Sequence, residues 1–340
     1  MESRLSGREE HKLQIEQSIQ KKIEGYPEII REYYFYLRVY SSGTKKTYIE
    51  KLLQFFHWCY DNQKIDAMTS EAIMHIPSLA IDEFFYQKSF ADDETIKETT
   101  QTIIFTAVNS FYEFLVRRKY IAENPIEGTK RPKVNKQNLA ISLSHDEIHT
   151  ILQTIEEGVG SNKAKGYQRA YRNRDKLLFL LPLTTGVRVS ALSEMDLSKI
   201  NLSTHEFSVI EKRDKMRTFE MGEEVFSILM DWIQDREQLL EGRFMEALFI
   251  TCKDGAPHRI SVRSIQRIIN KYSQCLDVNL SPHKLRRSYG TQFYRLSGND
   301  IIATAQQLGH DQIETTKLYI EPDTKLCKEV DQKISQYIWD

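Results

Sequence analysis

Arginine, histidine and tyrosine side chains recur in four short motifs in the second half of this chain. The motifs read TTGVRVSAL (184–192), SPHKLRRSYGT (281–291), LGHD (308–311) and ETTKLY (314–319). Arginine forks match the non-bridging oxygens of a phosphodiester, and fixed cations stabilise the charge that grows there at a pentacoordinate phosphorus. Histidine moves protons near neutral pH, and a tyrosine hydroxyl can attack phosphorus to form an ester. Together these residue types predict phosphoryl transfer through a covalent tyrosine ester.

Local signals predict how the first two motifs present their side chains. Gly186 follows an apolar helix as a terminating glycine does, so Arg188 begins the next helix at its electropositive end. The Ser-Pro pair at 281–282 is a helix start. His283 and Arg286 are three residues apart on that helix and share one face near its first turn. Both motifs therefore direct cationic or proton-carrying groups toward an anion.

The other two motifs place a histidine and a tyrosine just beyond a helix. Gly309 ends a helix expected over 301–307 and leaves His310 on a short turn. A threonine at 315–316 can cap a further short helix that carries Tyr319 about one turn in. Tyr319 is the candidate nucleophile.

A charged hairpin supplies a possible general acid. Residues 206–212 and 217–221 read as two strands joined by the turn 213–216. A lysine on this hairpin could protonate a leaving 5′-oxygen, and Lys212 and Lys215 both qualify by position.

The order of these motifs resembles the tyrosine recombinase (phage integrase) family. Thr-Gly-x-Arg, a hairpin lysine, His-x-x-Arg, Leu-Gly-His and a tyrosine nine residues after that histidine occur in sequence. The resemblance covers about 144–321, and more weakly a helical region over 27–125 that is similar to the family's core-binding domain. It implies that Lys212, which matches better than Lys215, is the hairpin lysine and that the catalytic set is Arg188, Lys212, His283, Arg286, His310 and the nucleophile Tyr319.

Two positions depart from the family pattern. Ala191 stands where the family often has a glutamate that supports the first arginine, so that support is expected from another contact. Ile320 and Glu321 stand where many members have Thr-His. Neither departure changes the expected catalytic set.

The resemblance also implies a mechanism without metal or cofactor. Tyr319 attacks a DNA phosphate to give a 3′-phosphotyrosine and a free 5′-hydroxyl, and strands exchange through a four-way junction. The implied partners are double-stranded DNA recombination sites, three further copies of this chain in a tetramer on two sites, and accessory DNA-bending or directionality proteins. Free protein is expected as monomer or dimer. The segment 322–340, with Leu326, Val330, Ile334 and Ile338 at helical spacing, either docks on a neighbouring protomer or packs on its own chain.

Several functions fit this chemistry. The first is site-specific recombination, with integration and excision of a mobile element preferred over an Xer-like dimer-resolving role. A type IB topoisomerase-like enzyme shares the chemistry, but the N-terminal helical domain and the tail after the tyrosine favour recombination. A non-catalytic DNA-binding protein is disfavoured because every catalytic residue type is present.

Charge distribution indicates where a polyanion could bind. The chain has 47 basic and 48 acidic residues, which taken alone argues against a general nucleic-acid binder. Basic residues nevertheless cluster at 130–138, 163–176 and 258–287. The candidate phosphate contacts are Lys130, Arg131, Lys133, Lys136, Arg259 and Arg287.

Composition narrows the class of protein. The 340 residues, 40% hydrophobic and 28% charged, suit a soluble chain of about two domains. No apolar run reaches the roughly 18 residues of a membrane span, and the first ten residues lack a signal peptide's apolar core. A cytoplasmic, nucleoid-associated protein is expected. The four cysteines have no C-x-x-C spacing, and His145 with His149 reads as a solvated helix face rather than a zinc site.

The elements predict a mainly α fold with an α+β catalytic domain. Four helices are expected at about 27–37, 44–59, 71–88 and 93–120, and a capping box of Ser144 and Glu147 opens the second domain. A third short strand is expected at 248–251, completing a small antiparallel sheet. The expected organisation is a tail or short helix (1–24), a helical core-binding DNA domain (25–126), a basic linker (127–143), the catalytic domain (144–321) and a C-terminal tail (322–340).

Overall fold

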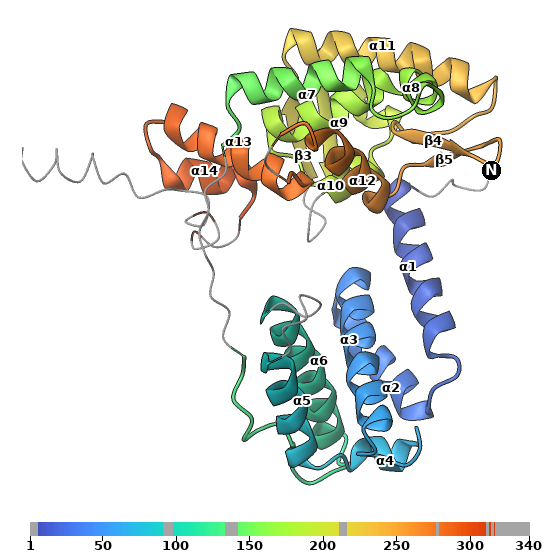
Figure 1. The fold of residues 1–340 in the computed structure, drawn as a ribbon, viewed down its shortest axis with the longest axis vertical. Coiled ribbons are helices and arrows are strands. Elements are labelled where there is room, and N and C mark those ends of the chain that lie inside the picture. The colour runs from blue at the N-terminus through green and yellow to red at the C-terminus, as the bar shows by residue number, and fades with distance from the viewer. Residues whose placement is uncertain are drawn as a thin grey trace, which may run out of the picture. The chain divides into compact units, whose positions relative to one another are not determined.

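The computed structural model describes residues 6–90, 98–132, 142–210, 216–276, 279–310, 313 and 316. It divides the chain into two compact units, one over Arg8–Gln137 and the other over Asn138–Asp340 together with Met1–Gly7. The division falls within the expected linker. The fold is mainly α with small antiparallel sheets, as predicted (Figure 1).

The N-terminal unit is built from helices. Their bounds are α1 (Gly7–Ile23), α2 (Glu28–Tyr36), the short 3-10 helix η1 (Leu37–Val39), α3 (Ser42–Asp61), α4 (Ser70–Met74), α5 (Ser78–Phe90) and α6 (Glu98–Arg117). The single helix expected over 71–88 is wrong: it is two helices, α4 and α5. Pro77 lies directly before α5, and a proline inside a helix lacks the N–H donor and clashes with the preceding turn.

Aromatic side chains fill the core of this unit. Tyr33 on α2 meets Phe111 on α6 edge to face, with ring centroids 5.2 Å apart, and Phe56 on α3 meets Phe111 at 5.4 Å. All three side chains are fully buried. Ile19 and Ile23 of α1 belong to the same core, so α1 is packed rather than loose.

The C-terminal unit combines helices with short strands. The helices are α7 (His145–Glu157), α8 (Asn162–Arg169), α9 (Arg172–Thr185), α10 (Val189–Glu194), η2 (Leu197–Lys199), α11 (Glu223–Leu240), α12 (Val262–Ser273), α13 (Pro282–Leu296) and α14 (Ile301–Leu308). The capping box that opens α7 is present: the Ser144 side chain accepts from the Glu147 N–H, and the Glu147 carboxylate accepts from the Ser144 N–H.

The strands of the described residues form two sheets rather than the single sheet expected. β1 (Ile200–Asn201), β2 (Glu206–Ile210) and β3 (Met216–Glu220) make an antiparallel sheet in that order. The expected strand at 248–251 lies instead at β4 (Ile250–Lys253), which pairs with β5 (Ala256–Arg259) in a separate hairpin. β5 contains Pro257 and no β-branched residue, so the sequence did not predict it.

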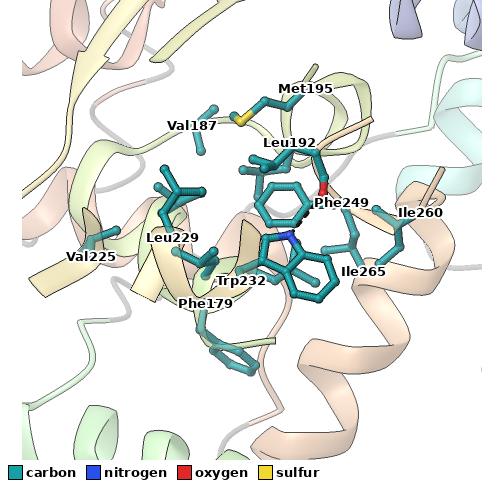
Figure 2. Packing of buried hydrophobic residues seen from close by; sticks show 14 of the residues in the cluster. Phe179, Val187, Leu192, Met195, Val225, Leu229, Trp232, Phe249, Ile260 and Ile265 are labelled. Carbon is teal, nitrogen blue, oxygen red and sulfur yellow. Dashed lines mark hydrogen bonds between the residues drawn. The ribbon is translucent and has the colours of Figure 1, made fainter. Parts of the chain in front are cut away.

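Trp232 of α11 lies at the centre of the core of the C-terminal unit (Figure 2). Its side chain is fully buried, and the indole Nε1 donates to the Leu248 carbonyl at 3.0 Å. Phe179 of α9 and Ile265 of α12 belong to the same cluster. This core packs α9 against α11, and α13 in turn packs against α9.

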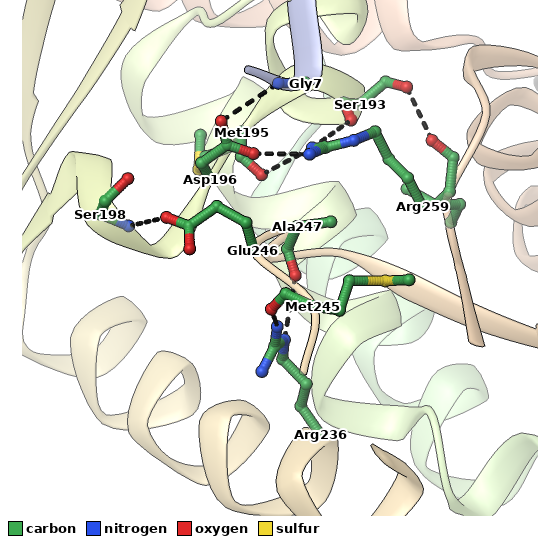
Figure 3. Close-up of polar contacts among 11 residues, drawn as sticks. Gly7, Ser193, Met195, Asp196, Ser198, Arg236, Met245, Glu246, Ala247 and Arg259 are labelled. Atoms are coloured by element: carbon green, nitrogen blue, oxygen red, sulfur yellow. Dashed lines mark hydrogen bonds and ion pairs between the residues drawn. The ribbon is translucent and has the colours of Figure 1, made fainter. Parts of the chain in front are cut away.

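Two arginines, Arg236 buried and Arg259 half-buried, tie loops to this core (Figure 3). The Arg259 guanidinium pairs with the Asp196 carboxylate at 2.6 Å, and the same carboxylate accepts from the Gly7 N–H at 3.2 Å. Arg236 of α11 donates from Nε to the Ala247 carbonyl at 3.0 Å and from Nη2 to the Met245 carbonyl. Buried cations of this kind need such partners because an unpaired buried charge is costly.

Candidate active site

The turn between α9 and α10 presents Arg188. Gly186 ends α9 in the left-handed conformation, with φ 69°, as its position in the sequence predicted. Its N–H donates to the Pro182 carbonyl at 3.1 Å. Arg188 is then the N-cap residue of the short helix α10. A left-handed residue costs a side chain steric strain that glycine avoids.

Helix α13 presents the histidine and the second arginine. The Ser281 side chain accepts from the Lys284 N–H at 3.3 Å, and Pro282 is the first helical residue, as predicted. His283 and Arg286 follow in the first two turns. Arg286 is buried, with 3% of its surface exposed, whereas His283 retains an exposed surface.

The two arginines converge on the carboxyl end of α14. Arg286 donates from Nη1 to the Gly186 carbonyl and from Nη2 to the Leu308 carbonyl. Arg188 donates from Nη2 to the Gly309 carbonyl at 3.0 Å and to the Leu308 carbonyl at 3.4 Å. Two motifs far apart in the sequence therefore share one carbonyl oxygen.

Helix physics explains why this helix end receives cations. The last carbonyls of a helix lack partners within it and carry the negative end of the helix dipole. Gly309 ends α14 in the left-handed conformation, with φ 57°, as predicted. A guanidinium has five N–H groups in a rigid fork, so a carbonyl that holds one edge also orients the others. These carbonyls supply the support for Arg188 that was expected from a contact other than position 191, where Ala191 stands.

The turn after α14 holds His310. Its N–H donates to the Ala305 carbonyl at 2.9 Å, and its ring Nδ1 lies 2.9 Å from the Thr316 hydroxyl. Thr316 is fully buried, so the ring is held from the inside of the protein. Thr316, one of the two threonines named as a possible cap, is a partner of His310.

Desolvation, and after it the charge of neighbouring arginines, lowers the pKa of His283 below its ordinary value of 6.5. Desolvation is the largest cause even though part of the side chain is accessible, and the charges of Arg287, Arg286 and Arg188 act in the same direction. The imidazole is therefore neutral at pH 7 and able to accept a proton.

A third arginine that sequence reasoning missed reaches the same helix end. Arg217 of β3 donates from Nη2 to the Gln307 carbonyl at 2.6 Å. The Gln307 side chain in turn donates from Nε2 to the Tyr289 hydroxyl at 3.0 Å. The sequence showed a charged hairpin and the motif containing Tyr289, but no spacing rule joins them to Gln307.

Tyr289 also packs closely on the turn that presents Arg188. A Cβ atom placed on Gly186 would lie 2.5 Å from Cδ1 of Tyr289 and 3.3 Å from Cδ2 of Leu308. Only glycine leaves room for this contact. Gly186 therefore serves both the backbone turn and the packing of α13 and α14 beside it.

Several predicted site residues lie outside the described part of the chain. They are Lys212, Lys215, Tyr319, Lys133 and Lys136, and the tail residues from Leu326 to Ile338. Their roles stay predictions.

The remaining candidate phosphate contacts have different surroundings. Lys130 and Arg131 are exposed, and Arg131 Nη2 lies 3.5 Å from the Thr106 hydroxyl. Arg287 is half-buried beside Arg286 on α13. Arg259 is engaged by Asp196, which gives it a structural role in the strand β5.

A basic stripe on α12 was not singled out from the sequence, although it lies in the basic region 258–287. Arg263, Arg267 and Lys271 recur every four residues, and they line an open cavity of about 470 Å³ with Asn279 and Ser281. Ser281 is the N-cap of α13, so the stripe adjoins the helix that carries His283 and Arg286.

The described residues were also compared with what a metal site or a membrane-spanning helix requires. Within the described ranges, no three potential ligands gather to hold a metal ion. His145 and His149 lie on an exposed face of α7 with their Nε2 atoms 3.0 Å apart, in line with the solvated face expected. No described helix is long and apolar enough to cross a membrane.

Comparison with known proteins gives a family model and relatives that agree with one another. The model of the phage integrase family matches residues 142–325. Tyrosine recombinase XerD of Staphylococcus aureus is 32% identical over 259 residues, covering 75% of this chain and 82% of the relative. XerD of Staphylococcus epidermidis is 29% identical over 299 residues, covering 86% and 92%.

Solved structures share the fold at low sequence identity. The XerH site-specific recombinase bound to difH, in a pre-cleavage complex, has TM-score 0.60 and 18% identity, covering 86% of this chain and 80% of that one. The Tn1549 transposon integrase in complex with transposon right end DNA has TM-score 0.59 and 15% identity, covering 90% and 99%.

Proposed function

Because this chain belongs to the phage integrase family of tyrosine site-specific recombinases, which cut and rejoin DNA strands, we propose that Tyr319 and the residues around α14 carry out that reaction. The Tyr319 hydroxyl oxygen attacks a DNA phosphorus, and the bond from phosphorus to the 5′-oxygen breaks. The product is a 3′-phosphotyrosine and a free 5′-hydroxyl. Reversal with the 5′-hydroxyl of a partner strand completes the exchange.

The arginines stabilise the charge of the transition state in this scheme. Arg188 and Arg286 bind the non-bridging oxygens, where negative charge grows as phosphorus becomes pentacoordinate. The observation that carries the proposal is their convergence on the Leu308 carbonyl from separate motifs. A carbonyl anchor that holds both guanidinium groups suits a site that must be preorganised for one phosphate.

Two protons move in each cleavage step. The Tyr319 proton passes to His283, whose lowered pKa keeps the imidazole neutral. Lys212 on the hairpin gives a proton to the leaving 5′-oxygen. His310, held by Thr316, donates to a non-bridging oxygen.

DNA binding is proposed for the exposed basic surfaces. Arg263, Arg267 and Lys271 on α12 supply phosphate contacts beside α13, and Lys130 and Arg131 supply others on the N-terminal unit. Binding should therefore weaken steeply with salt. Four protomers on two DNA sites are the proposed assembly, with accessory DNA-bending or directionality proteins as further partners.

The biological role we propose is integration and excision of a mobile element. A second candidate, Xer-type dimer resolving, is favoured by the 32% identity to XerD of Staphylococcus aureus. The two roles differ in where the core sequence lies in the source genome. A site at the ends of an element supports integration, and one site on a circular chromosome supports dimer resolving.

Covalent trapping tests the reaction and identifies the site. The protein is mixed in EDTA with a pool of nicked, randomised DNA duplexes, and adducts that survive SDS are recovered and sequenced. Tyr319→Phe is the control, because it removes only the attacking oxygen.

We expect an adduct that requires Tyr319 and contains a recurrent core sequence. DNA binding by Tyr319→Phe should stay close to that of the unmodified protein. An adduct that persists in Tyr319→Phe would contradict the assigned nucleophile, and bound DNA that never yields an adduct would contradict the reaction.

A further inference from the structure

The hairpin that leads to Lys212 is bonded to the end of α14 through Arg217. Arg217 lies on β3 opposite Val209 on β2, and residues 211–215 join the two strands. Its Nη2 donates to the Gln307 carbonyl at 2.6 Å. The base of the hairpin is thereby bonded to the last turn of α14.

A second contact holds the same guanidinium in place. It lies over the ring of Phe219, with the central carbon 4.7 Å from the ring centroid. Phe219 is buried and stacks across the strands on Phe207, with centroids 5.3 Å apart. The cation is thus held by an aromatic face of the hairpin and by a carbonyl of the helix.

The carbonyl that Arg217 binds adjoins the one that anchors the phosphate-binding arginines. Gln307 directly precedes Leu308, whose carbonyl accepts from both Arg188 and Arg286. The Gln307 side chain also donates to Tyr289 of α13. One turn of α14 therefore connects the hairpin, α13 and the turn that presents Arg188.

We propose that Arg217 is a positioning residue that sets the hairpin, and with it the hairpin lysine, against the two phosphate-binding arginines. This inference rests on the proposed function. A general acid acts only when its proton lies within hydrogen-bond reach of the leaving oxygen. A hairpin released from α14 would keep its lysine but lose that alignment.

The chemistry of the leaving group separates this role from a direct contact with phosphate. Breaking the bond from phosphorus to a 5′-oxygen requires a proton for the alkoxide. If sulfur replaces that bridging oxygen, the leaving thiolate is stable without a proton. A defect in delivering the proton is then bypassed, whereas a defect in stabilising the phosphorane charge persists.

The experiment compares two substrates with one set of variants. The duplex recovered by covalent trapping is synthesised with either oxygen or sulfur at the bridging 5′-position, and adduct formation is timed in single turnover with the full chain. Arg217→Met keeps an apolar stem over Phe219 and removes the donor. Thr218→Val is the matched control, since Thr218 lies on the same strand and its hydroxyl contacts only the neighbouring strand at Ser208 among the contacts described.

We expect Arg217→Met to cut the oxygen substrate about 10- to 100-fold more slowly, the scale of a misplaced catalytic group. It should cut the sulfur substrate at the wild-type rate, as Lys212→Ala should. Arg188→Ala should stay slow on both substrates, and Thr218→Val should be normal on both. If Arg217→Met does not fold, as judged by its melting curve, Arg217→Lys carries the same comparison.

Other outcomes overturn the inference. Equal slowing on oxygen and sulfur would make Arg217 a phosphate contact or a purely structural residue, and no slowing on either would remove any role. If the wild-type protein forms the adduct but the sulfur substrate does not restore the rate of Arg217→Met, only this inference is contradicted. A wild-type protein that forms no adduct contradicts the proposed function and this inference with it.

Discussion

At the scale of single residues, the two arginines at the α14 end should respond differently to truncation. Arg286 is buried and donates to two carbonyls, so Arg286→Ala should cost about 1–3 kcal/mol for the Gly186 carbonyl and less for the Leu308 carbonyl, which still accepts from Arg188. Arg188 is half-buried at a helix start, so Arg188→Ala should cost less stability. Both should slow cleavage about 10²- to 10³-fold. Thermal melting and adduct rates at a temperature where each variant is folded measure the two effects separately.

The lysine variants are the controls for that pair. Arg188→Lys and Arg286→Lys keep a positive charge but lose the rigid fork that spans a carbonyl and a phosphate oxygen. They should recover only part of the cleavage rate. Full recovery would show that charge alone suffices and that the carbonyl anchor has no catalytic effect.

His283 sets the pH dependence expected of cleavage. Its pKa lies below 6.5 in the folded protein, so the neutral, proton-accepting form predominates at pH 7 and is lost as the pH falls through that pKa. Single-turnover cleavage should therefore fall on the acid side, below pH 6.5. The unfolded chain binds that proton more readily, so stability declines in the same direction and melting must be checked at each pH.

His283→Gln separates the histidine from other titrating groups. The amide cannot take up a proton, so the variant should be slow at every pH and lack the acid-side fall. An unchanged fall in His283→Gln would assign the titration to another group.

Candidate site residues could be predicted from the sequence where a helix cap or a helix-ending glycine lies beside them. Residues that reach the site only through tertiary contacts were missed. Arg188, His283, Arg286 and His310 each follow a cap or a helix-ending glycine that the structure contains. Arg217 has no such signal, because its partner is a backbone carbonyl on α14. Every residue has a carbonyl, so composition and spacing cannot indicate which one is used.

At the scale of elements, the turn between α9 and α10 should tolerate no side chain at Gly186. Gly186→Ala places Cβ 2.5 Å from Tyr289 and also forces a left-handed alanine, which costs about 1–2 kcal/mol by itself. We expect a larger loss of stability than that, with slower adduct formation because Tyr289 and Leu308 must move. Melting and single-turnover cleavage measure both.

Gly242 provides a matched control for the backbone effect. It has φ +80°, close to the +69° of Gly186, and a Cβ there would meet nothing within 4 Å. Gly242→Ala should lose only the stability that a left-handed alanine costs, and it should cleave DNA normally. If the two alanine variants behave alike, the contact with Tyr289 is not what makes Gly186 necessary.

Element predictions succeeded where hydrophobic periodicity and end signals agree. The apolar segment before Gly186 and the capped starts at Ser144 and Ser281 became helices as expected. The prediction of one helix over 71–88 was wrong because the apolar pattern continues across Pro77, whereas the helical backbone does not. β5 was not predicted because its pairing with β4, rather than its own residue types, makes it a strand.

At the scale of the whole molecule, each unit has its own hydrophobic core. The N-terminal core contains Phe111 and the C-terminal core contains Leu229, and both side chains are buried. The two cores are separate clusters that follow the division of the chain near Gln137. Units with separate cores can open separately, because the stability of each depends on its own packing.

Reciprocal core truncations test that independence. Phe111→Ala should destabilise its unit by about 3–5 kcal/mol and Leu229→Ala its own by about 2–5 kcal/mol, because each leaves a cavity. Hydrogen exchange should then lose protection in α3 and α6 for Phe111→Ala, and in α9 and α11 for Leu229→Ala. In each variant the other unit should exchange as in wild type. Protection lost throughout the chain in both variants would mean that the two units unfold as one. If the C-terminal unit stays protected in Phe111→Ala, the arginine anchor at α14 depends on the core of the C-terminal unit and not on that of the N-terminal unit.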